Sequence, residues 1–138
     1  MANVRLTRAV EFSTSLRYWN PDLSEAENRE LFGRKASRHG HNYRLEVTLA
    51  GEPDPVTGMV IDLKELQEVI DREVMSRFDH GDLNRDTPYF EKEPPTPENL
   101  ARVIERLLRA ALPSGLLHGI RLFEDADTFV DLVSGDAA

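Results

Sequence analysis

The 138-residue sequence contains no cysteine. This absence excludes disulfide bonds, thiolate metal sites and a cysteine nucleophile. The chain also has no apolar run that approaches the roughly 20 residues needed for a membrane-spanning helix. The N-terminal residues lack the apolar stretch of a signal peptide, so we expect a cytoplasmic protein.

Basic residues are also fewer than acidic ones. The chain has 17 Lys and Arg residues against 25 Asp and Glu residues, which gives a net charge of −8. General nucleic-acid binding depends on clustered basic residues that neutralise phosphates, so we expect neither nucleic acid nor a membrane as a partner. The length is close to the commonest size of a single domain, and we predict one domain over residues 1–138.

Hydrophobic periodicity and turn residues predict an alternation of strands and helices. Apolar, β-branched and alternating segments predict strands over residues 5–15, 42–50, 59–61, 117–123 and 128–133. Helix-capping residues followed by a 3.6-residue period predict a short helix from Ser24 towards Gly33, a helix of about four turns from Asp62, and a last helix from Thr96 to Pro113.

This order of elements indicates the α+β class. Two long helices on one face of a four-stranded antiparallel sheet would bury the apolar side of every element. The open edges of such a small sheet would be exposed to other chains, so we also expect a homo-oligomer assembled through those edges.

Chemistry-bearing residues first occur at the start of a predicted strand, in the sequence His39-Gly40-His41. Alternate residues of a strand point to the same side, so both imidazoles can converge on one point. Two histidines are an incomplete zinc site, because catalytic zinc usually has three protein ligands. The pair could instead be two hydrogen-bonded imidazoles without a metal.

A carboxylate and an imidazole are adjacent at Asp79-His80, where a predicted helix ends. The carboxylate could fix the tautomer of the ring and make it a general base, or both residues could simply cap the helix end. Glu124 follows a predicted apolar strand. It could accept two parallel N–H bonds from a guanidine-like heterocycle, as carboxylates do from arginine, or it could be a solvated strand end.

Taken together, the motifs of this chain resemble those of the family of 6-pyruvoyl-tetrahydropterin synthase and 6-carboxytetrahydropterin synthase. The matching stretches occur in the family order and span nearly the whole chain: Val10–Ser15, Asn28–Gly33, His39–Tyr43, Gly58–Leu63, Phe78–Asn84, Pro95–Asn99 and Glu124.

The resemblance implies a tunnelling fold (T-fold), in which the sheets of several copies join into a barrel. It further implies a hexamer with active sites between subunits. It also implies a Zn²⁺ ion held by three histidines, two of which match His39 and His41.

For the reaction, the resemblance implies a proton relay matching Asp79 and His80, a pterin anchor matching Glu124, and Thr96 near the ring. The predicted function is therefore that of a carbon–oxygen lyase acting on a dihydropterin such as 7,8-dihydroneopterin triphosphate. A non-catalytic pterin- or purine-binding paralogue is the alternative, and an assembly or regulatory subunit is a third. We expect the imidazoles, the Asp–His pair and Glu124 to line one cavity, completed by a second copy.

Two positions depart from the family pattern. Leu16 stands where the first zinc histidine is expected, which makes zinc doubtful unless Glu11, Tyr18 or a neighbouring subunit supplies a ligand. Lys35 stands where the catalytic cysteine is expected. A neutral Lys35 could act as a base, a protonated one could bind an anionic substrate tail, and an exposed one would be chemically idle.

Overall fold

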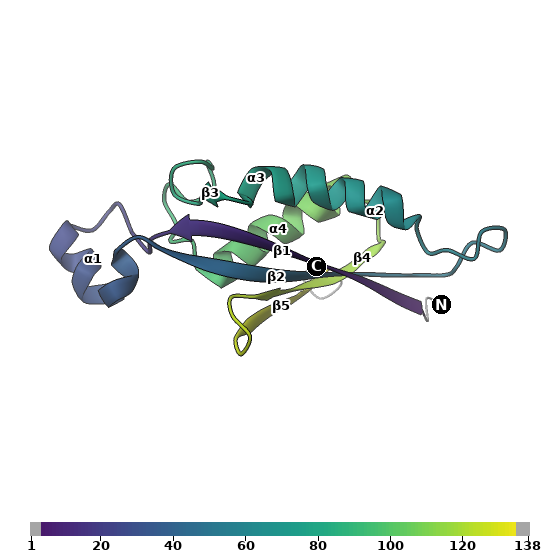
Figure 1. Ribbon diagram of the computed structural model, residues 1–138, viewed down its shortest axis with the longest axis horizontal. Helices are drawn as coiled ribbons and strands as arrows, with labels where there is room; N and C mark the ends of the chain where they lie inside the picture. The colour runs from purple at the N-terminus through teal and green to yellow at the C-terminus, as the bar shows by residue number, and fades with distance from the viewer. Residues whose placement is uncertain (1–3, 135–138) are drawn as a thin grey trace.

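A twisted sheet runs along the molecule, and the long helical segments cover one of its faces in the computed structural model (Figure 1), which describes residues 4–134. The strand order is β3-β1-β2-β4-β5. The strands are β1 (Val4–Leu16), β2 (His39–Gly51), β3 (Gly81–Asp82), β4 (Leu117–Phe123) and β5 (Phe129–Val133). This arrangement confirms the α+β class. The sheet is not the four-stranded antiparallel one predicted from the sequence: it is mixed and has five strands, because β3 adds a short parallel strand to β1.

Strands β1 and β2 form one long antiparallel pair, in which Leu16 lies opposite His39 and Val4 lies opposite Gly51. The predicted strand at residues 59–61 was wrong, because that segment forms no strand. The second neighbour of β2 is β4 instead. Three residues that lead directly into a helix cap offer few ladder hydrogen bonds, whereas β4 offers a seven-residue partner.

The predicted four-turn helix is one continuous helical segment made of α2 (Leu63–Ile70), a π-helical turn η2 (Asp71–Met75) and α3 (Ser76–Phe78). Its fully buried side chains recur every four residues: Leu66, Ile70, Val74 and Phe78. In a regular α-helix this spacing drifts by about 40° per step, and the wider π turn absorbs the drift. Leu63, in the first turn of α2, does not continue this buried row and is 49% exposed.

The two remaining helices begin at the predicted caps. Helix α1 (Glu25–Phe32) starts at Ser24 with both hydrogen bonds of a capping box, and a short 3₁₀ turn, η1 (Gly33–Ala36), follows it. Helix α4 (Pro97–Ala111) starts at Thr96, and it packs on the sheet beside α2. Within residues 4–134, no helix combines the length and the apolar character needed to cross a membrane.

Candidate functional site

The alternation of β2 places both histidines of the His39-Gly40-His41 motif on the helix-covered face of the sheet. His39 and His41 have the same parity as the buried residues Tyr43 and Leu45. Their ring centroids lie 5.1 Å apart and the rings are nearly perpendicular. The convergence of the two imidazoles that the sequence predicts is therefore present in the fold.

The tautomer of neutral His39 follows from its surroundings. Its Nδ1 atom lies 2.8 Å from the carbonyl oxygen of Ser37. A carbonyl oxygen can only accept, so the proton of the neutral ring belongs on Nδ1 and the lone pair on Nε2. Among residues 4–134, the buried Nε2 atoms of His39 and His41 have no hydrogen-bond partner. The Nε2 atom of His39 is therefore available to a ligand.

Glu124 reaches the same place from the end of β4. Its Oε1 atom lies 2.9 Å from His41 Nε2, but the two atoms are not aligned for a hydrogen bond. The hydroxyl of Tyr18 donates to the same oxygen at 3.3 Å. The Glu124 side chain is only 14% exposed. Burial lowers the pKa of His41, and the nearby carboxylate of Glu124 only partly offsets this effect.

Tyr18 completes this group, which we call the His–Glu cluster: Tyr18, His39, His41 and Glu124. The Tyr18 ring meets the His39 ring edge-on at 5.8 Å. Burial, reinforced by Glu124, raises the pKa of Tyr18 well above its usual value, so its hydroxyl remains a donor. From the sequence, Tyr18 was predicted only as a possible substitute metal ligand. Its parity with the buried residues Thr14 and Leu16 was the signal for its position.

The N-terminus of α4 approaches the His–Glu cluster. Glu98, in the first turn of α4, is close enough to contribute to the raised pKa of Tyr18. Thr96, predicted to lie near the substrate ring, is half-buried at the N-cap, and its hydroxyl accepts a hydrogen bond from the backbone N–H of Asn99. Its observed contact is thus a helix cap, and its role towards a substrate stays a prediction.

The pair Asp79-His80 lies on the other side of β1 from β2. Asp79 Oδ1 accepts from the backbone N–H of Ser13 at 3.0 Å and lies 2.9 Å from His80 Nδ1. The Ser13 N–H is the main cause of the lowered pKa of Asp79. The His80 ring is 83% exposed. Within one chain, β1 therefore separates the pair from the imidazoles of β2, and a common cavity completed by a second copy stays a prediction.

Lys35 lies in η1 and is exposed. Its Nζ atom is 5.4 Å from the centre of the Tyr18 ring, and its backbone carbonyl accepts from the Tyr18 N–H at 2.7 Å. Lys35 therefore lies beside the His–Glu cluster, and it is close enough to contribute to the lowered pKa of His41.

A zinc site of the three-histidine type does not fit these residues. Leu16 is fully buried in the apolar core, and Glu11 is exposed on the opposite face of β1. The Tyr18 hydroxyl is already engaged by Glu124. Over the described part of the chain, no three His, Asp or Glu side chains are arranged to hold a metal ion. Two imidazoles remain, which is one ligand short of the usual catalytic zinc site.

Comparison with known proteins places this geometry in context. The family described as "6-pyruvoyl tetrahydropterin synthase" matches residues 5–134. The human 6-pyruvoyl tetrahydrobiopterin synthase is 38% identical over 128 residues, covering 91% of this chain and 88% of that protein. The Drosophila melanogaster 6-pyruvoyl tetrahydrobiopterin synthase is 43% identical over 122 residues, covering 86% and 73%.

The solved structure of Caenorhabditis elegans 6-pyruvoyl tetrahydropterin synthase superimposes with a TM-score of 0.89 at 32% identity, covering 95% of both chains. The fold is therefore an α+β T-fold, as the sequence resemblance implied. The chain belongs to the 6-pyruvoyl tetrahydropterin synthase family. It does so without a cysteine.

Proposed function

We propose that the His–Glu cluster binds a pterin ring and that the chain acts as a carbon–oxygen lyase on a dihydropterin such as 7,8-dihydroneopterin triphosphate. The observation that carries the proposal is the buried carboxylate of Glu124, which lies between the Tyr18 hydroxyl and His41. The amino-pyrimidine edge of a pterin presents adjacent N–H donors, and a carboxylate is the acceptor that matches them.

The two imidazoles would bind the side chain of the substrate. The Nε2 lone pair of His39 can accept a hydrogen bond from a substrate hydroxyl, and His41 Nε2 offers a second polar contact next to it. A buried polar atom without a partner costs about 1–3 kcal/mol, which a polar ligand would recover. A ligand that carries both a guanidine-like ring edge and hydroxyl groups therefore suits the cluster.

Asp79 and His80 would supply the proton transfer. With the Nδ1 proton directed at Asp79, the exposed Nε2 lone pair of His80 can accept a proton from a C–H bond of the substrate side chain. The electron pair released from that bond forms a C=C bond, while the adjacent C–O bond breaks and triphosphate leaves. Because β1 separates His80 from the imidazoles of its own chain, this role requires a neighbouring copy, in line with the proposed hexamer.

A second candidate is a pterin- or purine-binding protein without turnover. The exposure of Lys35 favours it, because no buried group stands at the position where the family pattern has its catalytic thiol. A guanine ring shares the amino-pyrimidine edge of a pterin, so Glu124 would suit both ligands.

The test is incubation of the full chain with 7,8-dihydroneopterin triphosphate from pH 6 to pH 10, with measurement of released triphosphate. Turnover should fall by about 100-fold or more in Asp79→Asn, since a positioned base is worth about 10²–10⁴ in rate. Asp127→Asn, the same change at an exposed turn residue, should leave turnover unchanged. Glu124→Gln should weaken binding of 7,8-dihydroneopterin.

The outcomes separate the candidates. Binding that requires Glu124, without release of triphosphate at any pH, establishes the binding protein and excludes the lyase. Absence of pterin binding, or binding that Glu124→Gln leaves unchanged, contradicts both candidates.

A further inference from the structure

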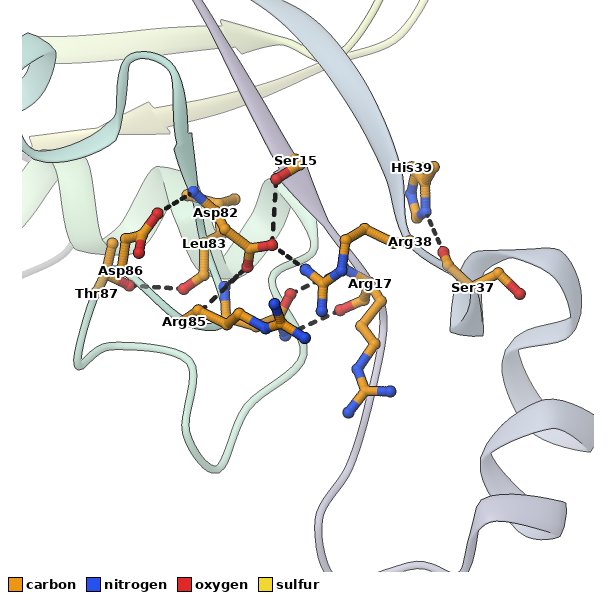
Figure 2. A network of polar contacts seen from close by, with 11 residues as sticks. Ser15, Arg17, Ser37, Arg38, His39, Asp82, Leu83, Arg85, Asp86 and Thr87 are labelled. Atoms are coloured by element: carbon orange, nitrogen blue, oxygen red, sulfur yellow. Dashed lines mark hydrogen bonds and ion pairs between the residues drawn. The ribbon is translucent and has the colours of Figure 1, made fainter.

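A second polar site lies on the other side of the strand ends that carry the His–Glu cluster. It is a pocket of about 250 Å³, here called the arginine pocket, lined by Arg17, Trp19, Pro21, Arg38, Asn84, Arg85, Phe90 and Glu91. Arg38 precedes His39 in sequence, and Figure 2 shows the Arg38 side chain turned towards Asp82 and the His39 side chain turned towards Ser37; no residue of the His–Glu cluster lines the pocket. The arginine pocket is therefore distinct from the His–Glu cluster.

The first arginine of the pocket, Arg17, has its guanidinium stacked on an aromatic ring and its backbone fixed by a side chain. The guanidinium carbon of Arg17 lies 3.9 Å from the centre of the Trp19 ring. The Asn84 side chain fixes the Arg17 backbone, because it accepts from the backbone N–H of Arg17 at 2.8 Å and donates to the backbone carbonyl of Arg17 at 3.0 Å. Such an arginine loses little conformational freedom when it binds a ligand.

The second arginine is oriented by Asp82, at the centre of the network in Figure 2. Arg38 forms an ion pair with the Asp82 carboxylate. Asp82 also accepts from the Ser15 hydroxyl at 3.1 Å and from the backbone N–H of Arg85 at 3.1 Å. Burial alone would raise the pKa of Asp82, but these donors together lower it. Asp82 therefore stays ionised and fixes Arg38.

The third arginine, Arg85, is exposed. In the part of the chain that the structure describes, the guanidinium groups of Arg17 and Arg85 form no ion pair, and Glu91 is the one acidic residue that lines the pocket. A chain with a net charge of −8 has thus gathered three arginines from three separate segments around one cavity.

We propose that the arginine pocket binds a polyphosphate group. Guanidinium groups present planar pairs of N–H donors that match phosphate oxygens, and they remain charged at every working pH. A ligand with a single carboxylate would not use three arginines, because one carboxylate accepts one bidentate arginine. A chain of linked phosphates offers each arginine its own oxygens.

Two sources of this group can be distinguished. The first is the triphosphate tail of a substrate bound at a neighbouring copy, and this assignment rests on the proposed function. The second is free inorganic polyphosphate, which does not depend on a pterin. The polyphosphate site itself depends only on the residues that line the arginine pocket.

The test is calorimetric titration of the full chain with inorganic tripolyphosphate at low ionic strength. Arg85→Gln should weaken binding about tenfold, because one charge-assisted contact is worth roughly 1.4 kcal/mol or more. Arg72→Gln has the same change of charge on an exposed residue outside the pocket and should have no such effect. Glu91→Gln should strengthen binding by removing a like charge, and added salt should weaken it.

Parallel titrations with 7,8-dihydroneopterin triphosphate and 7,8-dihydroneopterin identify the source. If Arg85→Gln weakens binding of tripolyphosphate and of the pterin triphosphate but not of the pterin alone, the pocket holds the substrate tail. If it weakens only tripolyphosphate binding, the pocket serves free polyphosphate. If tripolyphosphate does not bind, or binds equally to Arg85→Gln and Arg72→Gln, the proposal is overturned. Failure of all pterin binding alongside intact tripolyphosphate binding would remove only the proposed function.

Discussion

The His–Glu cluster and the turn over residues 82–85, here called the Asp82 turn, lie near the same strand ends, yet the hydrogen bonding of their polar groups differs. In the His–Glu cluster, the buried Nε2 atoms of His39 and His41 have no hydrogen-bond partner among residues 4–134. At the Asp82 turn, one carboxylate accepts from Ser15 and two backbone N–H groups and pairs with Arg38.

This difference indicates that the imidazoles of the His–Glu cluster serve to bind a ligand, whereas the Asp82 carboxylate serves to stabilise the fold. A carboxylate whose oxygens are all occupied stabilises the fold and has little left to offer a ligand. Buried imidazole nitrogens without partners lower the stability of the free protein and gain the most from a ligand. The comparison therefore predicts that changes to the Asp82 carboxylate alter the free energy of unfolding, whereas changes at the His–Glu cluster alter the binding of a pterin.

The largest effect is expected for Leu16→His, which adds a third imidazole to the incomplete set. Zinc affinity should rise by at least about 100-fold, since a missing ligand costs more than the 10–100-fold typical of an outer partner. Without zinc the variant should be less stable than the wild type, because a fully buried leucine is lost. Zinc titration by calorimetry, and melting with and without zinc, measure both changes. Equal zinc affinity of wild type and variant would show that the natural chain already has a complete site.

Asp82→Asn should lower the free energy of unfolding by about 2 kcal/mol at pH 7, the value of a hydrogen bond to a charged group. The pKa of Asp82 is lowered in the folded protein, so its contribution is complete above the unfolded-state pKa of about 3.9 and is lost as the pH falls through the folded-state pKa. Urea unfolding at pH 7 and at pH 2 measures the difference, with the exposed Asp127→Asn as control. A difference that persists unchanged at pH 2 would exclude the ionised carboxylate as its cause.

The smallest effect is expected for Tyr18→Phe, which removes only the hydroxyl that donates to Glu124. We expect a loss of about 0.5–1 kcal/mol in unfolding free energy, because at 3.3 Å this hydrogen bond is long and therefore weak. Binding of 7,8-dihydroneopterin should weaken about threefold, since Glu124 would lose a contact that orients it. Urea unfolding and calorimetry measure these values. Tighter pterin binding by the variant would mean that Tyr18 competes with the ligand for Glu124.

Much of the fold was predictable because it depends on local patterns. The caps at Ser24, Asp62 and Thr96 start helices α1, α2 and α4 as expected. Strand β3 could not be predicted, since its two residues are a strand only by pairing with β1. The π turn was hidden as well, because an apolar spacing of four fits a regular helix nearly as well.

In the candidate site, too, the features that depend on local sequence were predictable and those that depend on distant residues were not. Strand alternation predicted that His39 and His41 converge, because that property belongs to one strand. The contact between Tyr18 and Glu124 joins residues 106 positions apart, and no local pattern encodes it. The arginine pocket was missed for the same reason, since its arginines belong to separate segments that only the folded sheet brings together.

A structure of the full chain with bound 7,8-dihydroneopterin would show directly whether the His–Glu cluster is the pterin site. We predict that the amino-pyrimidine edge of the ligand contacts Glu124 and that its side-chain hydroxyls lie within hydrogen-bond distance of His39 and His41. A ligand bound elsewhere, with the two imidazole nitrogens still lacking partners, would contradict the account.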